Sequence, residues 1–237
     1  MDAIHTSHEY AFVGDWAGNI IVFNDQIQRL HTFSLITEKE TLNSMDVGLN
    51  AFYYEDNRLI IGTRGNEVYE YTFNPENGSK KFDHIITQGH YAPSKTWTNE
   101  VWGLSVFKNK DEYITCSDDA TLRHWSIKEK KMLNVISLNK NMDGNDLEMD
   151  PKTKELSDAA KARALDVNDD GKIIAVGFWD GSMKIISTAN WKILNEMKVA
   201  KEWVSDVKFS PNKKFLAYAS HDNKVYIHTV HDMKKKF

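Results

Sequence analysis

The chain has 237 residues, of which 41% are hydrophobic, so it is long enough to bury a sizeable core. Its net charge of -4 gives no electrostatic case for nucleic acid, and no basic stripe interleaved with aromatic residues appears. The sequence shows no signal-peptide pattern and no apolar run near the roughly 20 residues of a membrane span, so no membrane partner is expected. The single cysteine, Cys116, predicts a buried, reduced thiol in a cytosolic protein.

One short phrase, a tight turn followed by an alternating β-rich run, returns along the chain. Its copies are Trp16–Phe23, Asp118–Trp125, Trp179–Ile186 and His221–His228, with a fainter copy at Arg64–Tyr71. Such a phrase is typical of the hairpin that leads into the third strand of a propeller blade. The copies recur at intervals of roughly 40 to 60 residues, which is the period of WD-type repeats. The sequence therefore predicts an all-β, WD40-type β-propeller with about five blades.

In chain order the predicted blades cover approximately residues 1–36, 47–88, 89–138, 160–200 and 201–231. The polar segment 37–46 is expected to cross between the first two blades, and residues 74–79 to form a hairpin loop. Residues 139–160 are charged and poor in apolar residues, which predicts an insertion loop, and residues 154–164 favour a short helix. The last blade has no fourth strand, and the first has no opening strand unless residues 2–8 supply it. We therefore expect an incomplete or open ring, completed by further blades from the rest of a longer protein or from another chain.

The third blade carries the residues of a buried hydrogen-bond relay that is shared by WD repeats. A relay of this kind joins a loop His, a strand Ser or Thr, a turn Asp and a strand Trp, because buried polar groups must find partners. The matching residues are His90, Thr115 or Ser117, Asp119 and Trp125. The turn positions of the last two blades are held by Asp180 and Asp222. Other blades depart from the pattern, since Phe23, Ile186 and His228 stand where Trp is expected.

The wording of several segments resembles the echinoderm microtubule-associated protein-like family. These segments are residues 59–65, Gly89-His90 with 100–104 and 114–119, residues 173–177, and residues 204–211 with 215–227. The resemblance covers most of residues 10–230 and is strongest for 88–125 and 204–227. It implies the region that enters the second of two fused atypical propellers; the family's hydrophobic motif and N-terminal coiled coil are not seen. It further implies association with tubulin or with other cytoskeletal or axonemal proteins, in the cytoplasm, cytoskeleton or cilium.

Two tryptophans, Trp16 and Trp179, fall inside the predicted turns, where other copies of the phrase carry Arg64 and His221. These turns emerge together on one face of a propeller, and an exposed Trp is costly unless a partner covers it. Trp16, Arg64, Trp179 and His221 are therefore candidate partner contacts. The alternative is that each Trp folds back on the insertion or on a neighbouring blade.

No catalytic, cofactor or metal motif is found. Residues 166–173 imitate the start of a calcium loop, but Gly177 stands where a bidentate Glu is required. The pairs His5/His8 and His228/His231 lie outside any helical pattern, and their spacing places no further ligand beside them. We therefore expect a non-catalytic microtubule-associated scaffold that binds through propeller loops. The alternative is a generic WD-repeat scaffold in a non-cytoskeletal multiprotein complex.

Overall fold

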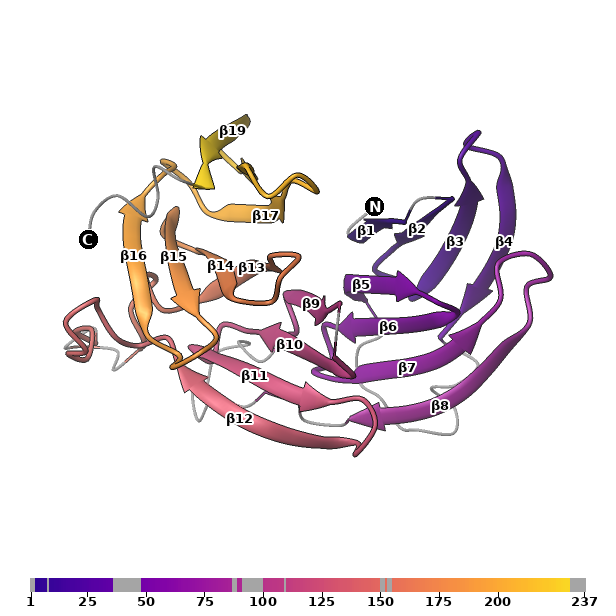
Figure 1. Ribbon diagram of the computed structural model, residues 1–237, viewed down its shortest axis with the longest axis horizontal. Coiled ribbons are helices and arrows are strands. Elements are labelled where there is room, and N and C mark those ends of the chain that lie inside the picture. Colours follow the sequence, from indigo (N-terminus) through magenta and orange to yellow (C-terminus); the bar gives the residue numbers. More distant parts are fainter. Residues whose placement is uncertain are drawn as a thin grey trace. The chain divides into compact units, whose positions relative to one another are not determined.

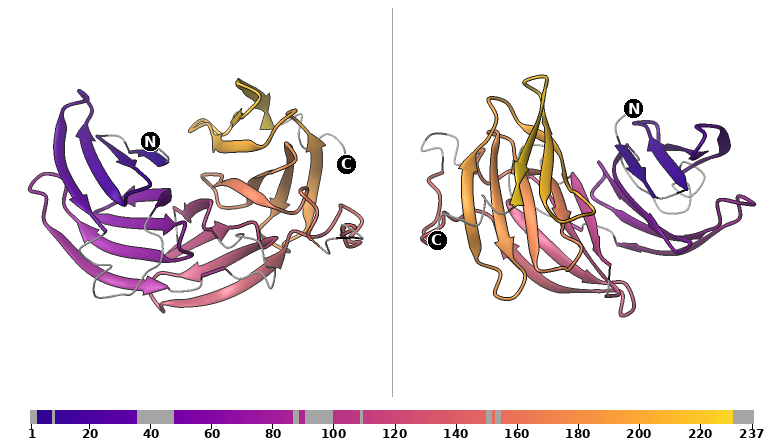
Figure 2. Two further views of the ribbon diagram at one scale, coloured as in Figure 1. Left: turned by 180° about the vertical axis from the view of Figure 1, so that it is seen from behind. Right: turned by 45° about the horizontal axis from the view of Figure 1, so that its top comes forward.

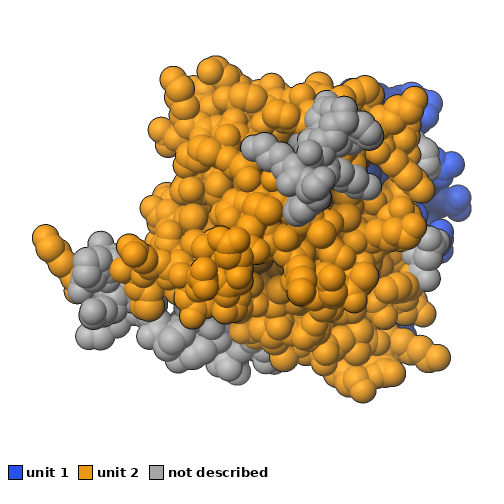
Figure 3. Space-filling view, turned by 60° about the vertical axis from the view of Figure 1, so that its left-hand side comes forward, with its two compact units in different colours: residues 1–91, 99–104 blue, residues 92–98, 105–237 orange. Residues whose placement is uncertain are grey.

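The computed structural model describes residues 3–7, 9–35, 48–86, 89–90, 100–108, 110–149, 152 and 155–230. The chain divides into two compact units (Figure 3). Residues 1–91 and 99–104 form the first unit, and residues 92–98 and 105–237 form the second. The expected crossing over residues 37–46 lies outside the described residues. No helix in the described part of the chain is long and apolar enough to cross a membrane.

The first unit contains two antiparallel four-stranded sheets of the kind expected for propeller blades (Figure 1). Its strands are β1 (Ala3–Thr6), β2 (Tyr10–Gly14), β3 (Asn19–Asn24), β4 (Arg29–Ser34), β5 (Leu49–Glu55), β6 (Arg58–Thr63), β7 (Val68–Phe73) and β8 (Lys80–Ile86). β1 supplies the opening strand that the sequence left uncertain. β8 was expected over residues 84–88 but begins four residues earlier. Its first four residues are exposed, so this outer strand lacks the apolar alternation that marks inner strands.

The second unit contains two four-stranded sheets and one three-stranded sheet (Figure 2). Its strands are β9 (Gly103–Phe107, from Ser105 onward), β10 (Glu112–Cys116), β11 (Thr121–Ser126), β12 (Lys131–Ser137), β13 (Ala162–Val167), β14 (Ile173–Phe178), β15 (Ser182–Ser187), β16 (Ile193–Lys198), β17 (Val204–Phe209), β18 (Phe215–Ser220) and β19 (Lys224–Thr229). Among the described residues the last sheet has three strands, in the order β17-β18-β19. The fold is thus all-β and built from propeller-type blades, as the repeats predict.

The repeated phrase corresponds to the tight turn between the second and third strands of each sheet. One residue of every such turn has a positive φ, and these residues are Gly18, Asn66, Ala120, Gly181 and Asn223. Glycine and asparagine tolerate this left-handed conformation best, which explains their recurrence in the phrase. Ala120 is the exception, with φ of 60°.

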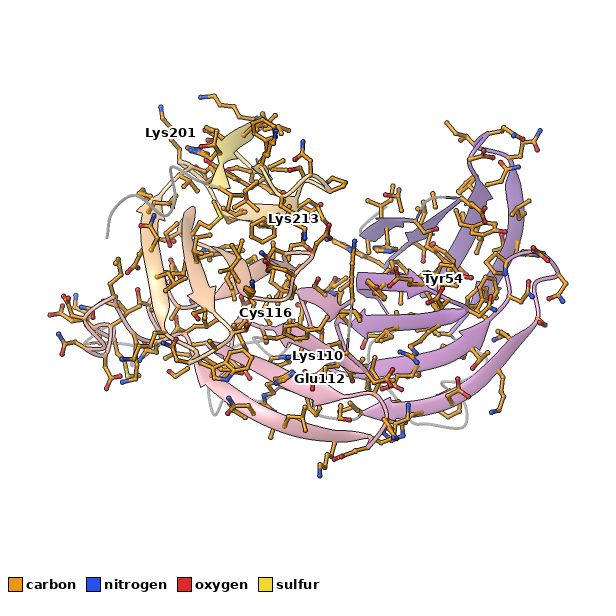
Figure 4. The ribbon with its side chains drawn as sticks, viewed as in Figure 1. Tyr54, Lys110, Glu112, Cys116, Lys201 and Lys213 are labelled. Atoms are coloured by element: carbon orange, nitrogen blue, oxygen red, sulfur yellow. The ribbon has the colours of Figure 1, made fainter. Side chains whose placement is uncertain are left out.

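Consecutive sheets pack closely because a small residue ends the second strand. A Cβ added at Gly62 would lie 2.6 Å from Val101 Cγ1, and one added at Gly177 would lie closer still to Val204. Gly14 has the same relation to the first strand of its neighbouring sheet. In the third sheet this place is taken by Cys116, which is buried and unbridged as expected (Figure 4).

The segment after β12 begins with a small ordered hairpin. Lys140 and Asp146 form a β-bridge, and the buried Lys184 of β15 donates to Leu138 O (3.0 Å) and Lys140 O (2.8 Å). The short helix expected over residues 154–164 is wrong where the chain is described: residues 158–160 form a turn and β13 begins at Ala162. Ala162 N donates to Ser117 O, so sheet packing overrides the helix propensity of this segment.

Candidate partner-binding turns

Aspartates organise the turns that carry the candidate contacts in the second unit. Asp180 Oδ1 accepts from the backbone N (2.8 Å) and Oγ (2.5 Å) of Ser182, and Asp119 Oδ1 accepts in the same way from Thr121. Asp222 differs, because its Oδ2 accepts from the Tyr226 hydroxyl at 2.6 Å. That hydrogen bond holds the pKa of Asp222 below its usual value. These carboxylates therefore fix the shape of the turns on which Trp179 and His221 stand.

An ion pair and three stacked rings form a continuous row along these turns. The Arg163 guanidinium lies 2.7 Å from Asp118 Oδ2, and its Cζ lies 4.2 Å from the centroid of the Trp179 ring. The Trp179 and Trp203 rings are stacked with centroids 5.5 Å apart, and Trp203 and His221 with centroids 3.6 Å apart. We call Asp118, Arg163, Trp179, Trp203 and His221 the stacked row.

The row forms because its members come alternately from a turn and from the start of a first strand. Backbone hydrogen bonds tie these places together: Trp179 N donates to Lys161 O (2.9 Å), and His221 N donates to Trp203 O (3.0 Å). The row therefore crosses three successive sheets of the unit. Cation–π contacts of this type contribute about 0.5 to 2 kcal/mol each, so the row also stiffens the rim that it crosses.

One end of the row is buried and the other is open to solvent. Asp118 is buried and little of the Arg163 side chain is exposed, whereas Trp179 is 38% exposed and His221 is exposed. Trp179 does pack on the neighbouring sheet, as the alternative interpretation expected. It nevertheless keeps a substantial open surface, and the ring beneath it holds that surface in place.

The first unit carries a smaller arrangement of the same kind. Trp16 is 64% exposed, and the Arg64 Cζ lies 4.8 Å from its ring centroid. Arg64 Nε lies 3.5 Å from Glu100 Oε2, which also accepts from Asn50 Nδ2 at 3.0 Å. The four predicted contact residues thus fall into two pairs, Trp16 with Arg64 in this unit and Trp179 with His221 in the other.

Only part of the predicted relay is drawn together by the described contacts. Trp125 Nε1 donates to Thr115 Oγ1 at 2.9 Å, and both residues are buried. Asp119 is bonded within its own turn and lies 3.2 Å from the Arg123 guanidinium. His90 belongs to the first unit, where the Asn66 side chain bonds its backbone N and O. The complete four-residue relay remains a prediction.

Sequence reasoning missed Arg163 and Trp203. They stand beside the first positions of the first strands β13 and β17, and no copy of the turn phrase contains them. A signal was present, because Glu100 and Trp203 both directly precede the valine that packs against the glycine of the previous sheet. Comparison of these strand-start positions could have shown that each faces a turn residue.

The titratable groups elsewhere in the second unit are structural. Asp166 Oδ1 accepts from Ser105 Oγ (3.0 Å) and its Oδ2 from Phe209 N (2.8 Å), so its carboxylate joins three first strands. Burial raises its pKa. Asn168 Oδ1 accepts from Ile173 N, so the segment that imitates a calcium loop is a strand, a turn and a second strand. Within the described ranges no group of three or more metal-capable side chains occurs.

The family model described as the second β-propeller of echinoderm microtubule-associated protein matches residues 101–237. The chain belongs to the echinoderm microtubule-associated protein-like family. Mouse echinoderm microtubule-associated protein-like 1 is 24% identical over 92% of the chain, and this match covers 22% of that relative. Human echinoderm microtubule-associated protein-like 3 is 27% identical over 73% of the chain and 16% of its own length. The chain thus spans about a fifth of the family members that it matches, and its stacked row lies wholly within the second-propeller match.

Proposed function

We propose that this chain is a non-catalytic, microtubule-associated scaffold that binds tubulin or other cytoskeletal or axonemal proteins through its propeller turns. The observation that carries the proposal is the stacked row, with the Trp16–Arg64 pair as a second contact. Membership of a family whose relatives are named microtubule-associated proteins supports the choice of partner. The expected location is the cytoplasmic cytoskeleton, including the axoneme of cilia.

The physical basis of binding is a rigid aromatic anchor with a polar rim. Trp179 is held by Arg163 on one side and Trp203 on the other, so little side-chain entropy remains to be lost on binding. Exposed Lys201 and Glu202 flank the row, and Figure 4 labels Lys201 near the start of β17. Aromatic residues of this type dominate binding hot spots, whereas exposed rim charges contribute little. We therefore expect only moderate sensitivity to salt.

Further blades are proposed as a second kind of partner. The face of the last sheet that carries Ala217 and Ala219 also carries exposed Val225 and Ile227, because the four residues pair across β18 and β19. Ala219 ends β18 as Gly177 ends β14, and Gly177 is the point at which the next sheet approaches. A blade from the rest of the protein or from another chain would dock on this face in the same way.

The test is co-pelleting of the folded chain with stabilised microtubules over a salt series. Saturable pelleting is expected, and Trp179→Ala and Trp16→Ala should each weaken it. Trp191→Ala is the matched control, since Trp191 follows β15 at the opposite end of the sheet from Trp179. Circular dichroism of every variant establishes that it is folded. Failure of the folded wild-type chain to pellet would favour a scaffold for a non-cytoskeletal complex, and unchanged pelleting by both variants would exclude the turns as the contact.

A further inference from the structure

The outer edge of β12 differs from those of the other fourth strands. β4, β8 and β16 carry His31, Asp83 and Glu196 in their interiors. β12 reads Lys131-Met-Leu-Asn-Val-Ile-Ser137 and has no ionisable side chain after its first residue. Polar charges inside an edge strand oppose pairing with another chain. β12 lacks that protection.

The edge is also apolar and open. Met132, Leu133 and Val135 are 43%, 41% and 45% exposed, and β12 is the terminal strand in the order β12-β11-β10-β9. Figure 1 shows β12 at the outer side of its sheet. The backbone N of Val135 donates to the side chain of Asn134 at 2.9 Å, so this amide is bonded locally in place of a neighbouring strand. A partner strand could replace that acceptor with a carbonyl group.

The turn that leads into β12 is basic. Residues 128–131 are Lys-Glu-Lys-Lys, and the adjoining turn before β10 contributes Lys110, which lies 3.6 Å from Glu112 (Figure 4). The two turns touch, because Ile127 N donates to Asp111 O. The Lys131 ammonium lies 2.6 Å from Glu129 and lowers the pKa of that carboxyl, which is therefore ionised at neutral pH. Three lysines against one glutamate leave the turn with a positive charge of two.

We propose that the outer edge of β12 receives an extended segment of a partner protein by strand addition. The segment carries acidic residues opposite residues 128–131 and apolar residues at alternate positions along 132–135. Main-chain hydrogen bonds to the open edge provide the affinity, and the charge match sets the register. This surface lies on the side of the β9–β12 sheet, whereas the stacked row lies at the ends of the strands. It is independent of the proposed turn contacts.

The probe is a fluorescent synthetic peptide with an acidic run next to alternating Val and Thr, made with the acidic run at either end. Its affinity for the whole chain is measured by anisotropy, and backbone amide exchange locates the contact. One of the two peptides is expected to bind and to protect β12, more weakly at high salt. Val135→Lys should reduce that affinity by about tenfold, the effect of roughly 1.4 kcal/mol from a misplaced charge. Leu30→Lys on β4, a strand that already begins with Arg29, is the matched control and should bind as the wild type does.

A peptide N-methylated at alternate positions separates backbone pairing from simple apolar contact. It should lose binding while it keeps the same side chains. The proposal is overturned if neither peptide binds, if Val135→Lys binds as tightly as the wild type, or if protection appears away from β12. Concentration-dependent self-association that Val135→Lys abolishes would overturn it too, in favour of a second copy of this chain. Microtubule pelleting by the same variants keeps this result distinct from that of the turn contacts.

Discussion

Replacement of Gly181 by alanine should destabilise the second unit strongly, because two costs act at one position. Gly181 has φ of 82°, a conformation that costs an L-residue about 1 to 2 kcal/mol. An added Cβ would lie 2.6 Å from both Ala200 O and Glu202 O, which are backbone atoms that cannot rotate away. Overpacking of this type costs about 1 to 3 kcal/mol. We expect the free energy of unfolding to fall by about 2 to 5 kcal/mol in all.

The turn of the third sheet provides a matched control. Ala120 already occupies the equivalent left-handed position, with φ of 60°. Ala120→Gly relieves the backbone strain but removes a buried methyl group and frees the unfolded chain, so its effect should lie within about 1 kcal/mol of zero. Urea denaturation of both variants, followed by tryptophan fluorescence, measures the two changes. A loss below 1 kcal/mol for Gly181→Ala would show that the carbonyl groups at 200 and 202 do not confine this turn.

Three further predictions concern buried polar groups of the second unit. Lys184→Met leaves two carbonyl groups unpaired, so the hairpin after β12 should be cleaved faster in limited proteolysis and stability should fall by about 1 to 3 kcal/mol. Because burial raises the folded-state pKa of Asp166 above its unfolded value, stability should fall as pH rises through the folded pKa. This dependence should flatten in Asp166→Asn when unfolding is followed against pH, and an unaltered profile would contradict it. Thr115→Val removes the acceptor of the Trp125 indole and should cost about 1 to 3 kcal/mol in denaturant unfolding, whereas Thr115→Ser should retain most of it.

The strands of the inner layers could be predicted from the sequence, and the outer ones less well. Glu112–Cys116 was expected as a strand with the observed bounds, because its residues are almost all buried and a turn signal follows at once. β8 was displaced by four residues, since its charged start faces water and carries no periodic signal. The helix favoured over 154–164 failed because Ala162 is drawn into a sheet by its neighbour, an interaction that local propensity does not contain.

The sequence by itself determined the repeat, the left-handed turns and the family, because each depends on residues close together in the chain. The positions of Trp16, Arg64, Trp179 and His221 in those turns followed from the same local pattern. The stacked row was decided only by tertiary structure: residues 118, 163, 179, 203 and 221 come from three sheets, and contacts across such separations leave no local periodicity. The unprotected edge of β12 likewise appears only when the order of strands is known, since a run of apolar residues has the same local signature in a covered strand and in an open one.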